Sequence, residues 1–323
     1  MLQDNFDRKY NYLRLSVTEV CNFKCNYCLP DGYVCGSRPK TLSVDKISTL
    51  VSAFAMAGTK KIRLTGGEPT LRKDLADIVA ACSETHGIDT VAMTTNGYRL
   101  LEKLPRLVAS GLTNLNMSAD SLNPYTFSQI TGSDSLHEVL ACVDKALELG
   151  VKKVKLNAVL LKQYNANQFQ QFLNYIKGKP VTFRFIELMQ TGDNRDYFNA
   201  QHVQGQQLKQ QLLESGWRAV PKAVDAGPAE EFFHPHYAGQ IGLIMPYSKA
   251  FCASCNRLRV SAEGKLHLCL FGEANDDLTP WLDNQDVQGL ATHLLSRVQH
   301  KWQGHQLQMG RTGLTKQLAM LGG

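Results

Sequence analysis

Residues 12–28 read YLRLSVTEVCNFKCNYC, a strand pattern that runs directly into three closely spaced cysteines. Within residues 13–18 every second residue is apolar, and the residues between them are Arg, Ser and Thr. Alternation with a period of two is typical of a β-strand with one buried face and one polar face. The stretch therefore predicts a strand that ends in a loop with the spacing CxxxCxxC, formed by Cys21, Cys25 and Cys28.

The rest of the N-terminal two thirds alternates strand patterns with helix patterns. Predicted strands lie near 11–17, 60–65, 89–95, 113–119, 152–160 and 181–187. Between them, apolar residues recur at helical spacing, as in Ile47, Leu50, Val51 and Phe54, and Ser43 precedes that helix as a predicted N-cap. Alternating strands and helices predict a parallel sheet with helices outside it.

Several of these strands have a polar face as well as an apolar one. Arg14, Arg63, Asn116 and Lys155 lie on such polar faces. A parallel strand covered by helices on both sides should instead be almost continuously apolar. We therefore expect a curled sheet, closed or nearly so, around a wet and partly cationic lumen, unlike the filled interior of a TIM barrel. An antiparallel sheet with one solvated face is the alternative, and either face of 181–187 could point inward.

The regular pattern ends near residue 220. Residues 221–230 resemble a linker, 239–271 contain short strand patterns, and 285–301 form a polar helix pattern. The predicted fold class is α/β, with a partial (βα)6 TIM-like barrel over 1–220 and a C-terminal α+β region over 221–323.

Composition limits the function classes. The chain has 323 residues, enough for about two domains, and its 43% hydrophobic and 20% charged residues are ordinary for a globular protein. No apolar run approaches the ~18 residues of a membrane span, and residues 1–10 lack a signal-peptide pattern, so we expect a cytoplasmic protein. The net charge of +6 is unclustered, which argues against nucleic acid but fits either ordinary solubility or a small polyanionic ligand.

Six of the nine cysteines fall into two triplets, which indicates metal binding rather than disulfides. Three thiolates are enough for a cubane iron–sulfur cluster with one open iron. The second triplet is Cys252, Cys255 and Cys269, in the pattern CxxCNRxR-x9-C. Zinc is the alternative at each triplet, with Cys35 as a fourth ligand at the first and His267 at the second.

Two features together resemble the radical S-adenosylmethionine (SAM) enzymes. An aromatic residue, Tyr27, precedes the last cysteine of the first triplet, and Gly66-Gly67-Glu68-Pro69 follows the second predicted strand. The resemblance implies that Cys21, Cys25 and Cys28 hold a [4Fe-4S] cluster whose open iron binds SAM. It also implies that one electron from the cluster cleaves SAM to methionine and a 5′-deoxyadenosyl radical.

Nearly the whole chain is similar to one family of radical SAM enzymes, the GTP 3′,8-cyclases of molybdenum cofactor biosynthesis. Besides the two triplets, the motifs that carry this similarity are Tyr12-Leu-Arg14-Leu-Ser, Leu64-Thr-Gly-Gly-Glu-Pro-Thr-Leu-Arg72, Met93-Thr-Thr-Asn-Gly97, Phe185-Ile-Glu-Leu-Met189 and the terminal Gly322-Gly323. The resemblance implies a lyase that removes hydrogen from C3′ of GTP and yields (8S)-3′,8-cyclo-7,8-dihydroguanosine 5′-triphosphate.

The same resemblance implies cofactors, partners and residue roles. Cys252, Cys255 and Cys269 would hold a second [4Fe-4S] cluster that binds the purine. A flavodoxin- or ferredoxin-like protein would supply electrons. The product would pass to cyclic pyranopterin monophosphate synthase. A homodimer is also expected. The implied SAM contacts are Tyr27, Gly67, Ser118 and Met189. The implied GTP contacts are Arg14, Arg63, Thr94, Lys155, Arg257, Leu258 and Arg259. Of these, Lys155, Arg257 and Arg259 would have catalytic roles. Arg72 and Arg184 are secondary candidates for phosphate contacts.

Two other functions remain open from the residues alone. A peptide-modifying radical SAM maturase would need a peptide groove in place of a triphosphate site. A non-enzymatic iron–sulfur or zinc protein would not need the GGEP motif or a cationic lumen.

Overall fold

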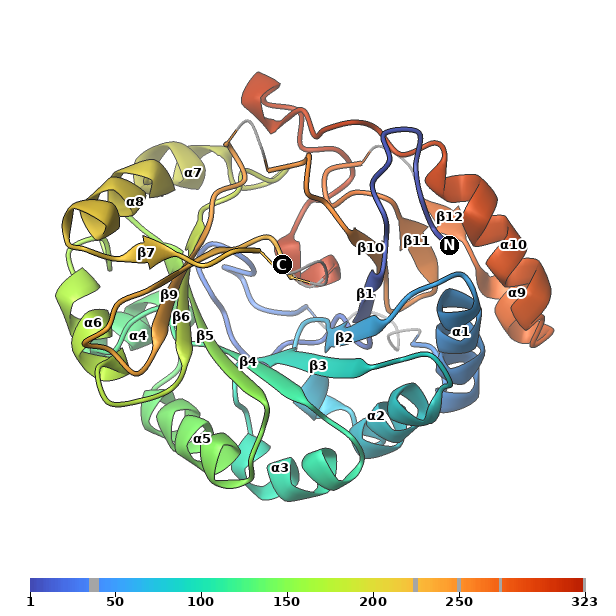
Figure 1. Ribbon diagram of the computed structural model, residues 1–323, viewed down its shortest axis with the longest axis horizontal. Coiled ribbons are helices and arrows are strands. Elements are labelled where there is room, and N and C mark those ends of the chain that lie inside the picture. Colours follow the sequence, from blue (N-terminus) through green and yellow to red (C-terminus); the bar gives the residue numbers. More distant parts are fainter. Residues whose placement is uncertain (35–40, 223–225, 249–250, 273–274, 322–323) are drawn as a thin grey trace.

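A computed structural model describes residues 1–34, 41–222, 226–248, 251–272 and 275–321. Six parallel strands are hydrogen-bonded in chain order and curl around a central space (Figure 1). They are β1 Tyr12–Ser16, β2 Lys61–Thr65, β3 Thr90–Thr95, β4 Asn114–Ser118, β5 Lys153–Leu160 and β6 Thr182–Glu187. The six predicted strands are therefore confirmed, and their parallel pairing excludes the antiparallel alternative.

Strands from the C-terminal part extend the sheet at both edges. β10 (Arg257–Val260) pairs in parallel with β1, and β9 (Gln240–Ile244) pairs in parallel with β6. Antiparallel strands then complete the order β12-β11-β10-β1-β2-β3-β4-β5-β6-β9-β8-β7. Their bounds are β7 Arg218–Ala219, β8 Glu230–Phe233, β11 Lys265–His267 and β12 Asp276–Asp277. The predicted domain boundary at residue 220 lies within this one sheet, between the paired strands β7 and β8, and stays a prediction.

The helices form an outer layer around the strands (Figure 1). They are α1 Val44–Met56, α2 Leu75–Glu84, α3 Leu100–Ala109, α4 Pro124–Thr131, α5 Leu136–Glu148, α6 Phe169–Ile176, α7 Arg195–Gln201, α8 Gly205–Glu214, α9 Thr279–Asp283 and α10 Val287–Val298, with 3-10 turns η1 Pro69–Leu71, η2 Leu307–Met309 and η3 Leu318–Met320. Ser43 caps α1 as predicted, because its side chain accepts a hydrogen bond from the backbone N–H of Lys46. The predicted helix over 285–301 is α10. No helix in the described part of the chain is long and apolar enough to cross a membrane.

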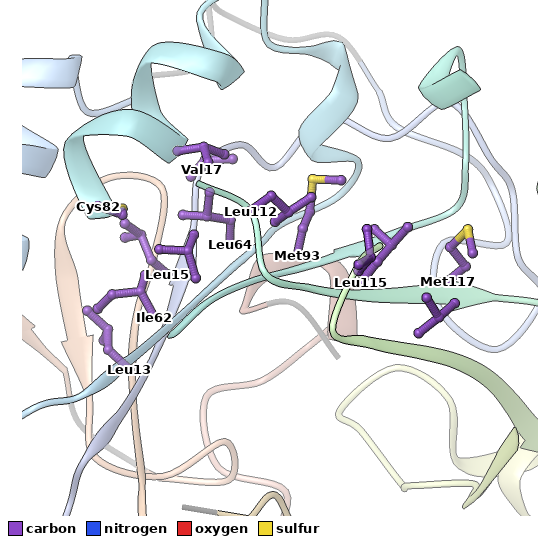
Figure 2. Packing of buried hydrophobic residues seen from close by; sticks show 14 of the residues in the cluster. Leu13, Leu15, Val17, Ile62, Leu64, Cys82, Met93, Leu112, Leu115 and Met117 are labelled. Carbon is purple, nitrogen blue, oxygen red and sulfur yellow. The ribbon is translucent and has the colours of Figure 1, made fainter. Parts of the chain in front are cut away.

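The main core lies between the outer face of the sheet and these helices. Figure 2 shows its strand side, with Leu13, Leu15, Ile62, Leu64, Met93, Leu115 and Met117. These are the apolar members of the alternating pattern, so their polar neighbours point to the lumen. Strand β6 follows the same rule: Phe183 and Phe185 pack on Phe172 of α6, at 4.5 and 5.1 Å between ring centroids, while Thr182 and Arg184 face the lumen.

Two glycines let the loop after β2 lie directly against the chain that leads to Cys21. Gly67 donates a hydrogen bond to Thr18 O (2.8 Å), and Glu68 donates one to Val20 O (2.8 Å). A Cβ at Gly66 would lie 2.2 Å from Thr18 O, and one at Gly67 would lie 2.2 Å from Val20 O. Gly66 also has φ +148°, a backbone conformation that other residues rarely adopt. The approach therefore requires glycine at both positions.

Gly67→Ala should displace residues 18–20 and with them Cys21, because backbone atoms occupy the space of the new methyl group. We expect a loss of about four irons per reconstituted chain, one cubane, and a destabilisation of about 1–3 kcal/mol. Gly178→Ala is the matched control, because nothing lies within 4 Å of its Cβ position. Iron analysis and thermal unfolding measure both effects. Equal iron content in the two variants would contradict the steric argument.

Cys82 on α2 and Cys142 on α5 are fully buried in the main core, as predicted, while Cys35 lies outside the described residues. We expect Cys82→Ala and Cys142→Ala to lower the free energy of unfolding by about 1 kcal/mol and to leave iron content unchanged. Loss of about four irons from either variant would show that it contributes a ligand.

Candidate active site

The first cysteine triplet lies on the loop that follows β1. Cys28 N–H and Leu29 N–H both donate to Cys25 O (2.9 Å each), which makes the loop turn tightly. Lys24 N–H and Asn26 N–H hold the same loop against the end of α4, through Thr131 O and Ile130 O at 3.0 Å. The loop is therefore fixed by backbone hydrogen bonds on both sides of Cys25.

The three thiols lie close enough to influence one another's ionisation. Burial raises the pKa of all three, and charge repulsion from neighbouring thiolates raises that of Cys25 and Cys28 further, to about 12 for Cys28. These raised pKa values keep the three groups as neutral thiols, and a bound metal centre would deprotonate them as ligands. The donor set fits an iron–sulfur cluster with three cysteine ligands.

Glu68 connects the GGE loop to the end of β3. Its buried carboxylate accepts hydrogen bonds from Thr70 N (2.9 Å), Thr95 Oγ1 (2.7 Å) and Asn96 N (2.6 Å). Burial raises the pKa of Glu68, and these three donors counter part of that shift. Asn96 Nδ2 in turn donates to Asn22 Oδ1 (3.0 Å), beside Cys21. Glu68 thus ties three segments around the first triplet together.

Asp120 is a polar residue at this site that the sequence analysis did not identify. It accepts hydrogen bonds from Tyr27 Oη (3.0 Å) and from Val159 N (2.8 Å), and its burial raises its pKa to about 6. Tyr27 and Ser118, two of the predicted SAM contacts, lie in this region at the end of β4. The signal that could have located Asp120 is its position two residues beyond Ser118, at the C-terminal end of a parallel strand.

A cavity of about 720 Å³ occupies the lumen. Among its described lining residues the carboxylates are Glu230 and Glu231, and the cationic residues are far more numerous: Arg14, Lys61, Arg63, Lys152, Lys153, Lys155, Arg184, Lys222, Arg257, Arg259 and Lys301. Thr94, Asn116 and Met189 also line it. The predicted cationic lumen is confirmed.

Three arginines form one row across the strands. Arg14 of β1 is in register with Arg259 of β10 on one side and with Arg63 of β2 on the other. Burial lowers the pKa of Arg259 to about 10, and the nearby Arg257 adds to that shift. Arg259 Nε is buried with no hydrogen-bond partner among the described residues. A row of three arginines, with the Arg259 Nε–H available as a donor, is suited to a multiply charged anion.

Tyr12 and Thr94 orient Arg63 within this row. Arg63 Nε donates to Tyr12 Oη, and its Nη1 donates to Thr94 Oγ1 (3.1 Å). Burial would raise the pKa of Tyr12, but Arg63, Arg14 and Lys61 outweigh burial and lower it to about 7. Neither Tyr12 nor Lys61 was among the predicted site residues. Lys61 could have been found, because it shares the polar face of β2 with Arg63.

Lys155 and Arg184 lie across the lumen from that row. Lys155 forms an ion pair with Glu231 of β8, and Arg184 Nε donates to Asn157 Oδ1 (2.9 Å). Burial lowers the pKa of Lys155 to about 8, with Arg184 adding to the shift and Glu231 opposing it. In register, Arg184 lies opposite Gly242, where a Cβ would be 2.7 Å from Arg184 Cγ. Glycine at 242 therefore leaves room for the arginine side chain.

The second triplet borders the same cavity. Cys252, Cys255 and Cys269 all line it, together with Arg257 and Arg259. Burial would raise the pKa of Cys255, but Lys301 and Arg257 outweigh it and lower the pKa to about 6. This thiol is therefore prepared for ligation as a thiolate.

Some predicted residues lie elsewhere. The side chain of Leu258 is buried in the main core and does not line the cavity, so only its backbone is near the site. Arg72 pairs with Asp74 (2.6 Å) and donates to Val17 O and Leu42 O, so it holds loops together away from the cavity. Gly322 and Gly323 lie outside the described residues.

The zinc alternatives gain no support from this geometry. In the part of the chain that the structure describes, no three His, Cys, Asp or Glu side chains converge closely enough to hold a single metal ion. His267 does not line the cavity with the second triplet. Cys35, the alternative fourth ligand at the first triplet, lies outside the described residues.

A small apolar cluster connects the two triplets. Leu270, Phe271, Leu307, Leu318 and Leu321 form its buried part. Cys28 of the first triplet, Cys269 of the second, and Met189 all pack against it. The C-terminal segment therefore lies beside both triplets, next to the cavity that Met189 and Phe271 line.

Comparisons with known proteins agree with this arrangement. The family model of the radical SAM superfamily matches residues 15–176, and the model described as Molybdenum Cofactor Synthesis C matches residues 181–307. In fold, the chain is similar to SAM-bound SuiB of Streptococcus suis, with a TM-score of 0.60 at 14% identity over 89% of this chain and 68% of that one. It is also similar to the hydrogenase maturase HydG, with a TM-score of 0.52 at 18% identity over 62% of this chain and 48% of that one.

Curated relatives are similar over the full length. A protein of Haemophilus ducreyi named GTP 3′,8-cyclase is 54% identical over 100% of this chain and 95% of its own length. One of Vibrio vulnificus with the same name is 49% identical over 99% of this chain and 97% of its own length. At this identity and coverage, the chain belongs to the GTP 3′,8-cyclase family of the radical SAM superfamily.

Proposed function

We propose that this protein converts GTP to (8S)-3′,8-cyclo-7,8-dihydroguanosine 5′-triphosphate, the first step of molybdenum cofactor biosynthesis. The observation that carries the proposal is the lumen: a row of three arginines, with Lys155 and Arg184 across from it, lines the cavity that Cys252, Cys255 and Cys269 border. A triphosphate needs several cations, and arginine provides bidentate geometry for phosphate oxygens.

The protein uses SAM and iron–sulfur chemistry, as its superfamily does. We assign Cys21, Cys25 and Cys28 to a [4Fe-4S] cluster that binds SAM, and Cys252, Cys255 and Cys269 to a second one that binds the purine. When bound, the first cluster and SAM supply the 5′-deoxyadenosyl radical that removes the hydrogen from C3′ of GTP. Tyr27, Gly67, Ser118 and Met189 are assigned to SAM.

The chain itself binds, orients and shields the substrate. Arg14, Arg63 and Lys155 are assigned to the triphosphate, with Thr94 holding the Arg63 guanidinium in place. Arg257 and Arg259 lie on β10 and line the cavity together with the second triplet. We assign Arg257 to the end of the nucleotide nearest that triplet, and Arg259, the neighbour of Arg14 in the row, to the phosphates. Leu258 contributes its backbone. In an enclosed lumen each of these charge interactions is stronger than in water, which fixes C3′ and C8 relative to each other.

The partners belong to the same proposal. A flavodoxin- or ferredoxin-like protein supplies electrons, cyclic pyranopterin monophosphate synthase takes the product, and the chain acts in the cytoplasm as a homodimer. The fold similarity to SuiB, at 14% identity, carries no argument about a peptide substrate. The lumen favours a compact polyanion over a peptide.

The decisive test is product formation by the anaerobically reconstituted chain with dithionite, SAM and GTP. We expect about eight irons per chain from two cubanes and 5′-deoxyadenosine formation that rises with GTP. If 5′-deoxyadenosine formation does not depend on GTP, the radical chemistry is supported and the assignment of GTP as substrate is contradicted. A fully loaded chain that forms no 5′-deoxyadenosine would favour a non-enzymatic iron–sulfur protein.

Arg257→Ala should weaken GTP binding and leave SAM cleavage without GTP unchanged, because Arg257 lines the cavity beside the second triplet rather than the first. A charge-assisted hydrogen bond contributes about 1.5–3 kcal/mol, so we expect a roughly 10- to 100-fold increase in the GTP dissociation constant. Arg106→Ala is the control, since Arg106 is exposed on α3 and pairs only weakly with Asp77 at 3.3 Å. Calorimetry under anaerobic conditions measures both, and wild-type affinity in Arg257→Ala would remove that residue from the site.

GTP affinity should fall as the pH rises through the pKa of Lys155, about 8. Protonated Lys155 attracts the triphosphate, so binding is strongest below that pKa and weakens above it, by about tenfold at pH 9. Lys155→Arg should remove this dependence, because arginine stays charged throughout. The dissociation constants of both proteins are measured from about pH 7 to pH 9. Because ionisation of GTP itself affects both proteins equally, the difference between the two profiles reports on Lys155. Parallel pH profiles for the two proteins would contradict the assignment of Lys155.

A further inference from the structure

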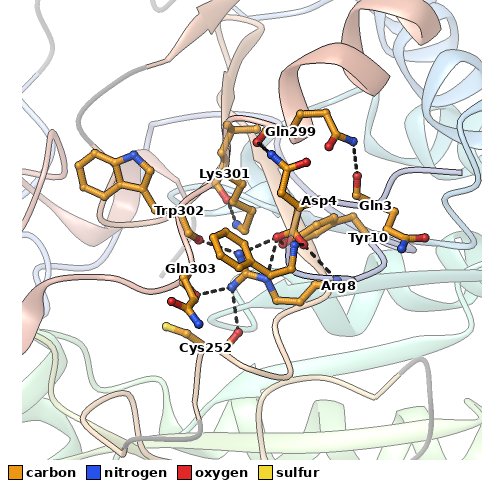
Figure 3. Close-up of polar contacts among 12 residues, drawn as sticks. Gln3, Asp4, Arg8, Tyr10, Cys252, Gln299, Lys301, Trp302 and Gln303 are labelled. Atoms are coloured by element: carbon orange, nitrogen blue, oxygen red, sulfur yellow. Dashed lines mark hydrogen bonds and ion pairs between the residues drawn. The ribbon is translucent and has the colours of Figure 1, made fainter.

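We propose that Arg8 is a positioning residue for the second cysteine triplet: it ties the backbone of Cys252 to that of Trp302 and Gln303 and so keeps the loops of that triplet together. The inference rests on the proposed function, in which Cys252, Cys255 and Cys269 hold a cluster. It adds a residue from the N-terminus, far from the triplet in sequence, whose contacts are drawn in Figure 3.

Arg8 lies on an N-terminal hairpin that is fixed at both ends. Leu2 N–H donates to Ala57 O (2.8 Å) and Tyr10 N–H donates to Leu2 O (2.9 Å). The hairpin also contacts the end of α10, where Gln299 Nε2 donates to Gln3 O (2.6 Å). It therefore provides a firm base from which Arg8 reaches the triplet.

Every nitrogen of the Arg8 guanidinium is engaged. Nε donates to Asp4 Oδ2 (2.7 Å), and Nη2 lies 2.6 Å from the same oxygen. Nη1 donates to Cys252 O (3.1 Å) and to Gln303 O (2.6 Å), and Nη2 donates to Trp302 O (2.6 Å). One planar group thus joins the carbonyl of a cysteine ligand to two carbonyls of another segment, a geometry that a lysine cannot reproduce.

Asp4 holds the Arg8 guanidinium in place and is itself fixed by other hydrogen bonds. Its carboxylate also accepts hydrogen bonds from Tyr10 Oη (2.6 Å), Phe6 N (2.9 Å) and Arg8 N (3.0 Å). Asp4 and Arg8 are 4% and 8% exposed, so removing either charge would leave its partner buried and uncompensated. The pair is therefore a rigid unit rather than a surface ion pair.

The segment that Arg8 holds reaches both ends of the triplet. Lys301 Nζ donates to Leu268 O, directly before Cys269, and lies 5.1 Å from the centre of the Tyr10 ring. His305 N–H lies 3.5 Å from Cys252 Sγ and donates to it. Residues 301–305 therefore bridge Cys252 and the chain before Cys269, and Arg8 fixes that bridge to the Cys252 backbone.

The contacts predict a selective effect. The first triplet is held by α4 and by residues 66–68, and none of its described hydrogen bonds involves the hairpin or residues 301–305. Outer contacts that orient ligand loops strongly influence metal binding. Loss of Arg8 should therefore release iron from the second triplet and leave the first loaded.

The experiment uses the full chain in two backgrounds. In the first, Cys21, Cys25 and Cys28 are replaced by serine, so that only the second triplet binds a cluster. In the other, Cys252, Cys255 and Cys269 are replaced by serine. Arg8→Gln, Arg8→Lys and the surface control Arg106→Gln are made in each, reconstituted anaerobically, and assayed for iron and for the EPR spectrum of the reduced cluster.

In the first background we expect Arg8→Gln to lower iron about fourfold, from about four to about one per chain, and to broaden or abolish the EPR signal. Arg8→Lys should restore part of the iron, and Arg106→Gln should keep all of it. In the other background Arg8→Gln should keep about four irons, which also shows that the variant folds.

Three outcomes overturn the inference. Full iron with an unchanged spectrum in the first background would show that Arg8 does not position the triplet. Equal losses in both backgrounds would show a general folding defect. If the first background binds no iron even with Arg8 present, the second-cluster assignment itself fails and the inference falls with it.

Discussion

Three guanidinium groups side by side in an enclosed space are the central constraint of this molecule. Arg259, Arg14 and Arg63 occupy one row across β10, β1 and β2, so their strands hold the backbones of the three residues about 5 Å apart. For Arg14 and Arg259, burial and the charge of neighbouring arginines both lower the pKa. The packed apolar face of the same strands stabilises the fold and so offsets this cost. An anion that enters the lumen would favour the charged forms of the arginines and relieve their repulsion.

The anions that the chain supplies are few and placed at the margins of this row. Glu231 reaches Lys155 from β8, and Cys255 is stabilised as a thiolate by Lys301 and Arg257. Neither neutralises the centre of the lumen. The remaining positive charge therefore attracts a polyanion, and the position of the second triplet determines which end of that molecule lies next to the cysteines. The charge distribution of the lumen thus affects both the attraction of a polyanion and the ionisation of Cys255.

Local sequence was sufficient for the six barrel strands, the inward cations Arg14, Arg63 and Lys155, and the two triplets, because each depends on a period of two or on short spacing. It could not locate the contact of Lys155 with Glu231 or that of Arg8 with Cys252, because these partners are 76 and 244 residues apart and only the fold joins them. The β1–β10 and β6–β9 pairings were also missed, since pairing between distant segments leaves no local pattern. The family motif wrongly suggested a side-chain contact for Leu258. Arg257 and Arg259 on either side of it face the lumen, so the alternation of the strand points Leu258 into the core.

Topology alone does not identify a substrate here, because a fold can host many functions. SuiB shares the arrangement of strands at 14% identity, and that likeness shows the fold alone. In this chain the inward positions carry the cations, and a change of one residue there alters charge without altering the packed outer face. Because outward positions maintain the core and inward positions face only the cavity, the two sets are physically independent. In a barrel of this kind the charge of the lumen can therefore change while the packed outer face, and the loops that it holds in place, stay the same.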